Sequence, residues 1–315
     1  MRYLHEILGT KYPIIQGGMA NIATGTFAAA CANAGALGII AAGGMDAATL
    51  EKEIRTCRSL TDKPFGVNLM LMNPHCDEMA EVLVRENVKF VTTGAGSPAK
   101  YMAAWKDAGI TVMPVAASVL LAKRLVDDGA DLIIAEGTES GGHVGEMTTL
   151  ALVPQMVDSL SVPVVAAGGV GSGRQLAAVM ALGACGVQIG TSLLVSEECP
   201  IHANYKQAIL DSKDNGTVVT GRSVNAPVRI LKNKMSRQYV RLERAGADRM
   251  ELEKYTLGSL RKAVFDGNVD EGSLMAGQIS GQLTEIRPLS VILEEMMKDA
   301  TAVAGALPGV MEALK

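Results

Sequence analysis

Aromatic residues are scarce in this sequence. One Trp, four Phe and six Tyr make up 3% of its 315 residues, so a core must be built from aliphatic side chains and the 17 Met residues. The one strongly basic segment offers few rings for stacking bases, Tyr239 and Tyr255 among them, and the rest of the chain is acidic. We therefore expect no nucleic-acid partner.

The sequence also lacks the marks of secreted, membrane and metal-binding proteins. Its five cysteines are odd in number and no two have the C-x-x-C spacing, which indicates neither a disulfide framework nor a zinc site. No apolar run approaches the roughly 18–20 residues of a membrane helix. The N-terminal MRYLHEILGTKYP has no signal-peptide core. We expect a cytoplasmic protein with no membrane partner and no metal ligands.

Short apolar runs recur as far as Ile189, and their starts lie 21 to 31 residues apart, the length of one strand and one helix. Several are rich in β-branched residues, as in strands buried on both faces. Segments with helical spacing separate them, and Ser118 and Ser172 stand where helices should begin. The runs are 13–15, 37–40, 65–69, 89–91, 111–115, 132–134, 163–166 and 186–189.

Eight strands that alternate with helices predict an α/β protein with a (β/α)8 TIM barrel. An open doubly wound sheet is the alternative, but eight near-even repeats favour closure, which leaves no sheet edge. The pattern breaks after the eighth strand, and residues 201–265 are interpreted as a smaller, mostly helical inserted domain. Residues 1–200 and 266–315 would then form the barrel, with helix again from Gly272 and over 289–314.

Charge is unevenly distributed between these two parts. Residues 201–265 hold 13 Lys and Arg against 6 Asp and Glu, a net charge of +7, whereas the remainder holds 16 against 27. Such asymmetry indicates either an acidic partner or pairing with the acidic barrel or a second subunit. Seven of the basic residues lie within 23 positions: Arg222, Arg229, Lys232, Lys234, Arg237, Arg241 and Arg244.

The stretch LIIAEGTESGGHVG, residues 132–145, joins a buried strand to a candidate catalytic group. Glu136 follows the apolar run, and Gly141 and Gly142 allow a sharp bend and the close approach of a flat ligand. His143 comes directly after them, and an imidazole at the end of a buried strand suits acid–base chemistry near neutral pH. The alternative is a surface histidine beside glycines that only turn the chain.

Two Gly-rich strand ends lie at the C-terminal face of the predicted barrel, where such barrels form their sites. Gly168-Gly169 and Gly190-Thr191 would offer backbone N–H groups, and helix N-termini would add partial positive charge, so a phosphate fits there. Glycines that serve packing alone are the alternative. The sequence has no G-x-G-x-x-G fingerprint at its start and no G-K-[ST] loop. A tethered phosphate therefore suggests flavin mononucleotide (FMN) or a phosphorylated substrate.

Seven motifs occur along the chain in a fixed order: IIQGGM, PFGVNLM, VTTGAG, AEGTESGGHVG, VPVVAAGG, VQIGT and SLMAGQI. Together they resemble the flavin-dependent enoyl-acyl-carrier-protein reductases, within the nitronate monooxygenase-like superfamily. The resemblance covers nearly the whole chain, including the insertion.

This resemblance implies bound FMN and a role for individual residues. His143 would lie beside the reactive face of the flavin, and Asn68 would bond its polar edge. Gly17, Gly18 and Met19 would pack against the ring, and Glu136 and Gly142 would line the ring and ribityl chain. Gly168, Gly169, Gly190 and Thr191 would hold the phosphate, Gln188 would also contact the cofactor, and Gly277 and Gln278 would close over it.

The resemblance further implies reduction of trans-2-enoyl thioesters in fatty acid biosynthesis. NADH or NADPH would reduce the flavin and leave before the thioester enters, a ping-pong hydride relay. His143 would give a proton or a hydrogen bond in the second half. An acyl carrier protein would dock on the basic insertion; a homodimer and a monovalent cation are further expectations. A nitronate monooxygenase, an NAD(P)H:quinone reductase and a phosphate-binding barrel without redox chemistry are the alternatives.

Overall fold

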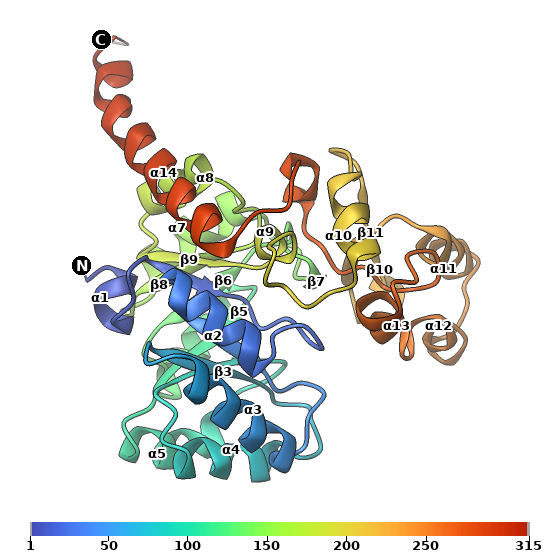
Figure 1. The fold of residues 1–315 in the computed structure, drawn as a ribbon, viewed down its shortest axis with the longest axis horizontal. Coiled ribbons are helices and arrows are strands. Elements are labelled where there is room, and N and C mark those ends of the chain that lie inside the picture. Colours follow the sequence, from blue (N-terminus) through green and yellow to red (C-terminus); the bar gives the residue numbers. More distant parts are fainter. Residues whose placement is uncertain (1, 314–315) are drawn as a thin grey trace.

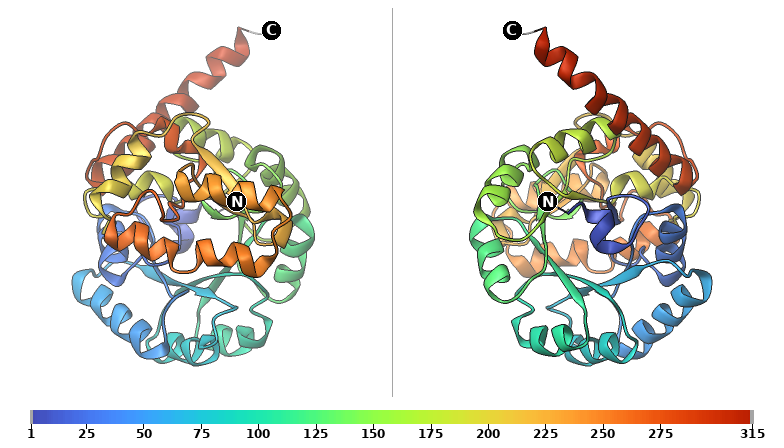
Figure 2. Two further views of the ribbon diagram at one scale, coloured as in Figure 1. Left: turned by 90° about the vertical axis from the view of Figure 1, so that its right-hand side faces the viewer. Right: turned by 90° about the vertical axis from the view of Figure 1, so that its left-hand side faces the viewer.

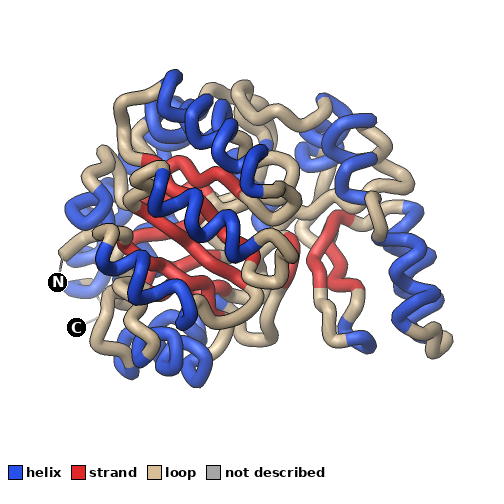
Figure 3. Tube along the Cα trace, turned by 90° about the horizontal axis from the view of Figure 1, so that it is seen from below, coloured by secondary structure: helices blue, strands red, loops and turns tan. Residues whose placement is uncertain are grey.

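The computed structural model describes residues 2–313, which form a barrel of eight parallel strands surrounded by helices (Figures 1 and 3). The strand order is β1-β9-β8-β6-β5-β4-β3-β2. A parallel bridge between Ile15 and Leu37 joins the two outer strands. The TIM barrel predicted from the sequence is confirmed. Its strands are β1 (Ile14–Gln16), β2 (Gly38–Ala41), β3 (Phe65–Met70), β4 (Phe90–Gly94), β5 (Thr111–Ala116), β6 (Ile133–Glu136), β8 (Val164–Ala167) and β9 (Gly186–Ile189).

A side chain completes the seam at which the barrel closes. Gln16 is fully buried, and its Oε1 accepts a 2.8 Å hydrogen bond from the backbone N–H of Ile39. The backbone N–H of Gln16 donates to the backbone carbonyl of Leu37 at 2.9 Å. Backbone groups left open where β1 and β2 diverge are thereby paired, as buried polar groups require.

The helices between the strands begin and end close to the predicted positions. Ser118 accepts a hydrogen bond from Leu121 and caps its helix, and Gly109 and Gly129 follow helix ends with positive φ. Ser172 also precedes a helix, but its hydroxyl bonds Gln175 and forms no cap. The helices are α2 (Gly25–Ala34), α3 (Ala47–Leu60), α4 (Cys76–Arg85), α5 (Ala99–Asp107), α6 (Val119–Asp127), α7 (Thr149–Ser159), α8 (Gly173–Ala181) and the short α9 (Thr191–Leu194).

The first and last helices cover different parts of the barrel. The short α1 (Leu4–Leu8) lies over one end, where Leu4 and Leu8 are buried (Figure 2). The last helix, α14 (Leu289–Glu312), packs against α8 so closely that a Cβ at Gly173 would come 2.3 Å from Met296 O. Beyond Ala300 it projects from the barrel with exposed residues (Figure 1). No helix among residues 2–313 combines the length and hydropathy needed to cross a bilayer. The predicted helix end at 314 lies outside the described residues.

The inserted segment is a small domain of helices and one hairpin at the other end of the barrel (Figure 2). The hairpin was not expected from the sequence. Its second strand pairs antiparallel with β7 (Gly142–His143), so the insertion and the loop after β6 share a three-stranded sheet. The elements are α10 (Ala203–Leu210), β10 (Thr217–Thr220), η1 (Arg222–Val224), β11 (Val228–Leu231), α11 (Lys234–Arg244), α12 (Arg249–Thr256) and α13 (Ser259–Asp266).

The return from the insertion to the barrel corrects one expectation. The helix predicted from Gly272 is absent between residues 267 and 277, which are irregular, and only the 3₁₀ turn η2 (Gln278–Gln282) follows. The apolar spacing there serves contacts with the barrel instead, because Leu274 and Ala276 are buried in its main core.

Candidate functional site

His143 lies on β7, directly opposite Val228 of β11, at the end of the barrel that the insertion covers. The next residue extends the contact, since Val144 N–H donates to Pro227 O at 3.2 Å. His143 is an exposed residue, although neighbouring protein atoms surround part of its ring. Partial burial by its surroundings lowers the pKa of His143 from its usual value, so the ring is neutral near pH 7.

Glu136 ends β6, in register with Ala167 of β8. Burial raises the pKa of Glu136 to about 7, and the nearby Ser140 hydroxyl offsets part of the shift. Near neutral pH this carboxyl is therefore divided between its protonated and ionised forms. Carboxyls with such perturbed pKa values at a strand end are typical of functional sites.

Close contacts join the ends of β1, β3, β4 and β9. A Cβ at Gly18 would come 2.6 Å from Asn68 Cβ, so only glycine fits there. Asn68 Nδ2 donates to the Thr92 hydroxyl at 2.9 Å, and Gly17 N–H donates to Ile189 O at 2.8 Å. The structure thus brings together the residues predicted to face a flat ring on this side of the barrel mouth.

The loops after β8 and β9 have the backbone shapes that their glycines allow. Gly168 and Gly169 both have positive φ, 83° and 73°. A Cβ at Gly168 would come 2.7 Å from Gly137 O, and Thr149 Oγ1 donates to Gly168 O at 2.8 Å. Gly190 lies against Met19, whose sulfur is 3.5 Å from the position of its absent Cβ. Two side-chain-free loops therefore adjoin the mouth of the barrel.

The segment around Gly277 lies on the loops after β6 and β9. Gly277 N–H donates to the Thr191 hydroxyl at 2.8 Å, and Gln278 N–H donates to Glu139 O at 2.9 Å. The missing side chain of Gly141 leaves room for Ala276, whose carbonyl carbon would be 2.7 Å from a Cβ there. Gly141 thus accommodates this segment of the chain, whereas the sequence suggested that it accommodates a ligand.

Some buried polar atoms near the mouth have no hydrogen-bond partner in the protein. Thr93 Oγ1 at the end of β4 and Ser192 Oγ on α9 are fully or nearly fully buried and unpaired. Buried hydroxyls are normally bonded. Thr93, however, alternates with Phe90 and Thr92 along β4 and faces the helix layer. Only Ser192 is therefore placed to meet a ligand. Neither was singled out from the sequence, because a hydroxyl's lack of a partner cannot be seen without coordinates.

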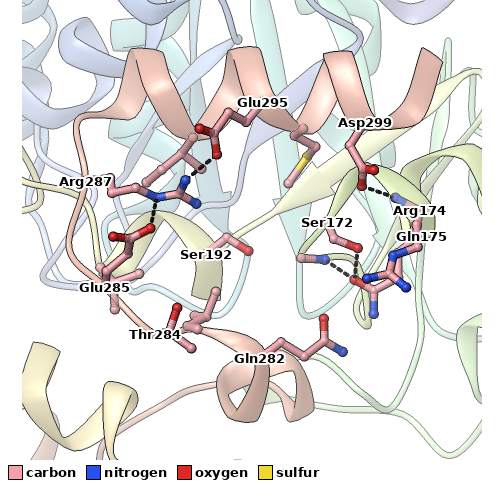
Figure 4. A pocket seen from close by; sticks show the side chains of 16 residues that line it. Ser172, Arg174, Gln175, Ser192, Gln282, Thr284, Glu285, Arg287, Glu295 and Asp299 are labelled. Carbon is pink, nitrogen blue, oxygen red and sulfur yellow. Dashed lines mark hydrogen bonds and ion pairs between the residues drawn. The ribbon is translucent and has the colours of Figure 1, made fainter. Parts of the chain in front are cut away.

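A pocket of about 630 Å³ lies between the start of α8, α9 and α14 (Figure 4). Ser192 points into it, and Arg287 pairs with Glu285 and Glu295 on one side. Gly171 is one of the residues that line the pocket, so the pocket adjoins the Gly168–Gly169 loop. None of the predicted site residues lines it.

Arg229 does not lie on the basic surface that was predicted for it. The sequence grouped it with a basic surface, but it is 6% exposed on β11, opposite Gly142. Its Nε donates to Thr138 O at 3.0 Å and its Nη1 to the Thr217 hydroxyl at 2.9 Å. It ties the hairpin to the loop that leads to His143. The sequence of β11, VRIL, carries no signal for this, because Arg229, Ile230 and Leu231 are all buried and the strand shows no alternation.

A family model described as nitronate monooxygenase matches residues 2–86 and 75–299. The chain belongs to the nitronate monooxygenase family. This agrees with the superfamily that its motifs resemble, and the protein is therefore an oxidoreductase.

Relatives in this family carry different activities. The chain is 32% identical to a probable nitronate monooxygenase of Staphylococcus saprophyticus, over 94% of this chain and 97% of that protein. It is 29% identical to (3aS,4S,5R,7aS)-5-hydroxy-7a-methyl-1-oxo-octahydro-1H-indene-4-carboxyl-CoA dehydrogenase of Mycobacterium tuberculosis, over 94% and 95%.

Among solved structures, FabK from Thermotoga maritima superposes with a TM-score of 0.95 at 42% identity, covering 98% of this chain and 99% of that one. A nitroalkane oxidase from Streptomyces ansochromogenes gives 0.86 at 27% identity, covering 96% and 99%. Both likenesses extend through the insertion, because they cover nearly all of each chain.

Proposed function

We propose that the protein is an FMN-dependent enoyl-acyl-carrier-protein reductase that reduces trans-2-enoyl thioesters with NADH or NADPH in fatty acid biosynthesis. The observation that carries this proposal is the likeness to FabK, at 42% identity over 98% of the chain. The motifs shared with flavin-dependent enoyl-acyl-carrier-protein reductases support it, because they run from IIQGGM at the start of the barrel to the MAGQ segment that lies on the site.

The residues at the barrel mouth fit FMN. The consecutive left-handed glycines 168 and 169 leave the end of β8 without side chains, and Gly18 leaves space beside Asn68 that a Cβ would fill. When bound, FMN would supply the hydride-transfer chemistry. Its phosphate would be held by Gly168, Gly169, Gly190 and Thr191, and its ring and ribityl chain by Gly17, Gly18, Met19, Asn68, Glu136, Gly142 and Gln188, with Gly277 and Gln278 above.

His143 would act on the thioester. Because its pKa is lowered, the imidazole is neutral at pH 7 and keeps one N–H. A neutral imidazole is a poor proton donor but a good hydrogen-bond donor, so it would polarise the thioester oxygen. His143 is an exposed residue, so its ring is open to a substrate.

The test uses the purified protein without added cofactor. We expect a yellow protein with flavin absorbance that oxidises NADH or NADPH only when a crotonyl thioester is present. A colourless protein that takes up no FMN would refute the cofactor, and a yellow protein inert toward the thioester would refute the substrate. The same measurements decide between NADH and NADPH.

A nitronate monooxygenase is the second candidate, because the family model bears that description and because a neutral His143 can also act as a base. In that reaction the imidazole would remove a proton next to the nitro group. The base is needed for a neutral nitroalkane and not for its nitronate, which has already lost that proton. Oxygen uptake with a nitroalkane or its alkyl nitronate that exceeds thioester-dependent NAD(P)H oxidation would favour this candidate.

The carrier of the thioester would be an acidic acyl carrier protein that meets the basic insertion. Arg229 was predicted to lie on this surface, but it is buried and does not belong to it. Electrostatic steering of this kind weakens with salt, so kcat/KM for a carrier-bound substrate should fall as ionic strength rises. We also propose a homodimer. The residues that stay exposed are Arg222, Lys232, Lys234, Arg237, Arg241 and Arg244.

A further inference from the structure

A groove of about 450 Å³ opens on the insertion between α11 and α12, away from every residue assigned to the flavin site. Three cationic side chains of α11 line it, and Tyr255 of α12 forms another part of its wall. Lys234, Arg237 and Arg241 follow one another at helical spacing on one face of α11.

The two arginines of this groove have no ion-pair partner among the described residues, although the carboxylate of Glu271 also lines the groove. Lys234 is paired with Glu271 at 2.6 Å. Among residues 2–313, neither Arg237 nor Arg241 forms an ion pair, and both are exposed. Like charges four residues apart on a helix repel, so their presence together disfavours the helix unless an anion joins them. Two guanidinium forks side by side are suited to the oxygens of a phosphate.

Tyr255 adds a flat apolar surface to these charges. It packs against the buried cluster of Met235, Tyr239 and Leu252, which fixes the position of its ring. An aromatic ring beside arginines is a common platform for a nucleotide base, because every base presents a π face. A fixed ring and two free arginines are thus the elements of a nucleotide phosphate site.

We propose that this groove binds the ribose phosphate of an adenine nucleotide, which both a coenzyme A thioester (3′-phosphate) and NADPH (2′-phosphate) carry. Arg237 and Arg241 hold the phosphate, and Tyr255 stacks on the adenine. NADH and a thioester of N-acetylcysteamine lack this phosphate, so they make no use of the two arginines. The inference rests on the proposed thioester reduction for its substrates.

The helix that lines the groove follows the strand that pairs with His143. Val228 lies opposite His143 on β11, and Lys234 begins α11 six residues later. The groove and the candidate catalytic residue are therefore on adjoining elements.

The experiment measures binding first and turnover second. Adenosine 3′,5′-bisphosphate and adenosine 2′,5′-bisphosphate are titrated into the holoenzyme by calorimetry, with AMP as the ligand that lacks the second phosphate. The variants are Arg237→Ala and Arg241→Ala, with Arg237→Lys to keep the charge without the fork. Arg244→Ala is the matched control, because it is an exposed arginine of the same helix outside the groove.

We expect one bisphosphate to bind more tightly than AMP, and its affinity to fall at least tenfold in both alanine variants but not in Arg244→Ala. The corresponding KM, for crotonyl-CoA or for NADPH, should rise by a similar factor at unchanged kcat, and Arg237→Lys should fall between. The bisphosphate that binds identifies which of the two cofactors uses the groove.

The inference is overturned if neither bisphosphate binds better than AMP, if the variants bind as well as the wild type, or if only the carrier-protein substrate responds to them. Turnover of the N-acetylcysteamine thioester with NADH keeps this outcome separate from the proposed function. If that turnover is present, the reductase stands whether or not the groove binds a nucleotide.

Discussion

His143 and Val228 face each other as a cross-strand pair between the barrel loop and the inserted hairpin. The candidate catalytic residue is therefore held by a β-ladder whose other strand belongs to the insertion. Arg229, the next residue of that strand, donates to Thr138 O and fixes the same loop from behind. Correct docking of the insertion is thus a condition for the correct position of the imidazole.

Replacing His143 should reduce thioester turnover without loss of the flavin. His143→Ala should lower kcat/KM by about 100-fold or more, in the range lost with a positioned acid, base or hydrogen-bond donor. The ladder to Val228 is made by the backbone, so the fold should persist. His143→Gln retains an N–H donor and should recover part of the rate. Wild-type turnover in His143→Ala would disprove the role.

Adding one methyl group at Gly18 should disturb the flavin site. The new Cβ would meet Asn68 Cβ at 2.6 Å, and such overpacking costs about 1–3 kcal/mol. Gly18→Ala should therefore melt at a lower temperature and purify with less FMN. Gly44→Ala is the control, because the nearest atom to its Cβ would be 3.8 Å away. Equal flavin content in both variants would contradict the close fit at Gly18.

The raised pKa of Glu136 predicts a pH-dependent stability. Burial holds it at about 7, above the unfolded value near 4.5, so the folded state binds the extra proton between these values. Stability without cofactor should therefore fall as pH rises from 4.5 to 7, by about 2 kcal/mol after allowance for partial exposure. Glu136→Gln should remove this dependence. Urea denaturation at pH 5 and pH 8 measures the free energy of unfolding at each pH. An equal change between the two pH values in the wild type and in Glu136→Gln would refute the prediction.

The bond between Thr191 and Gly277 should control how firmly the MAGQ segment lies on the site. Thr191→Ala leaves the Gly277 N–H without its acceptor, at a cost of about 1–2 kcal/mol. Amide hydrogen exchange at 275–282 should become faster, and FMN should dissociate sooner. Thr191→Ser keeps the hydroxyl and should behave as the wild type. Unchanged exchange in Thr191→Ala would mean that other contacts hold the segment.

The barrel could be predicted because its strands are buried runs repeated at even spacing. Leu132-Ile133-Ile134 and Val164-Val165-Ala166 carry their signal in composition alone. Gly168 and Gly169 were recognisable because a left-handed backbone there requires glycine. Local patterns of this kind are set by nearest neighbours along the chain.

Other features depend on partners far away in the sequence. The hairpin of β10 and β11 is short, and its pairing with Gly142 and His143 links positions more than eighty residues apart. Residues 272–277 have apolar spacing because Leu274 and Ala276 contact the barrel core, so the spacing did not make a helix. Arg229 could not be separated from its basic neighbours until its bond to Thr138 was known.

The outer half of α14 has a practical consequence for work with the protein. From Ala300 to Met311 it carries no charged residue, and Leu307, Val310 and Met311 are 47–56% exposed. An exposed apolar helix of this kind tends to bind other apolar surfaces, so we expect the protein to associate or precipitate through it at high concentration. Ending the chain after Thr301 should give a better-behaved sample for crystals and leave the chemistry at the opposite side of the molecule unaltered.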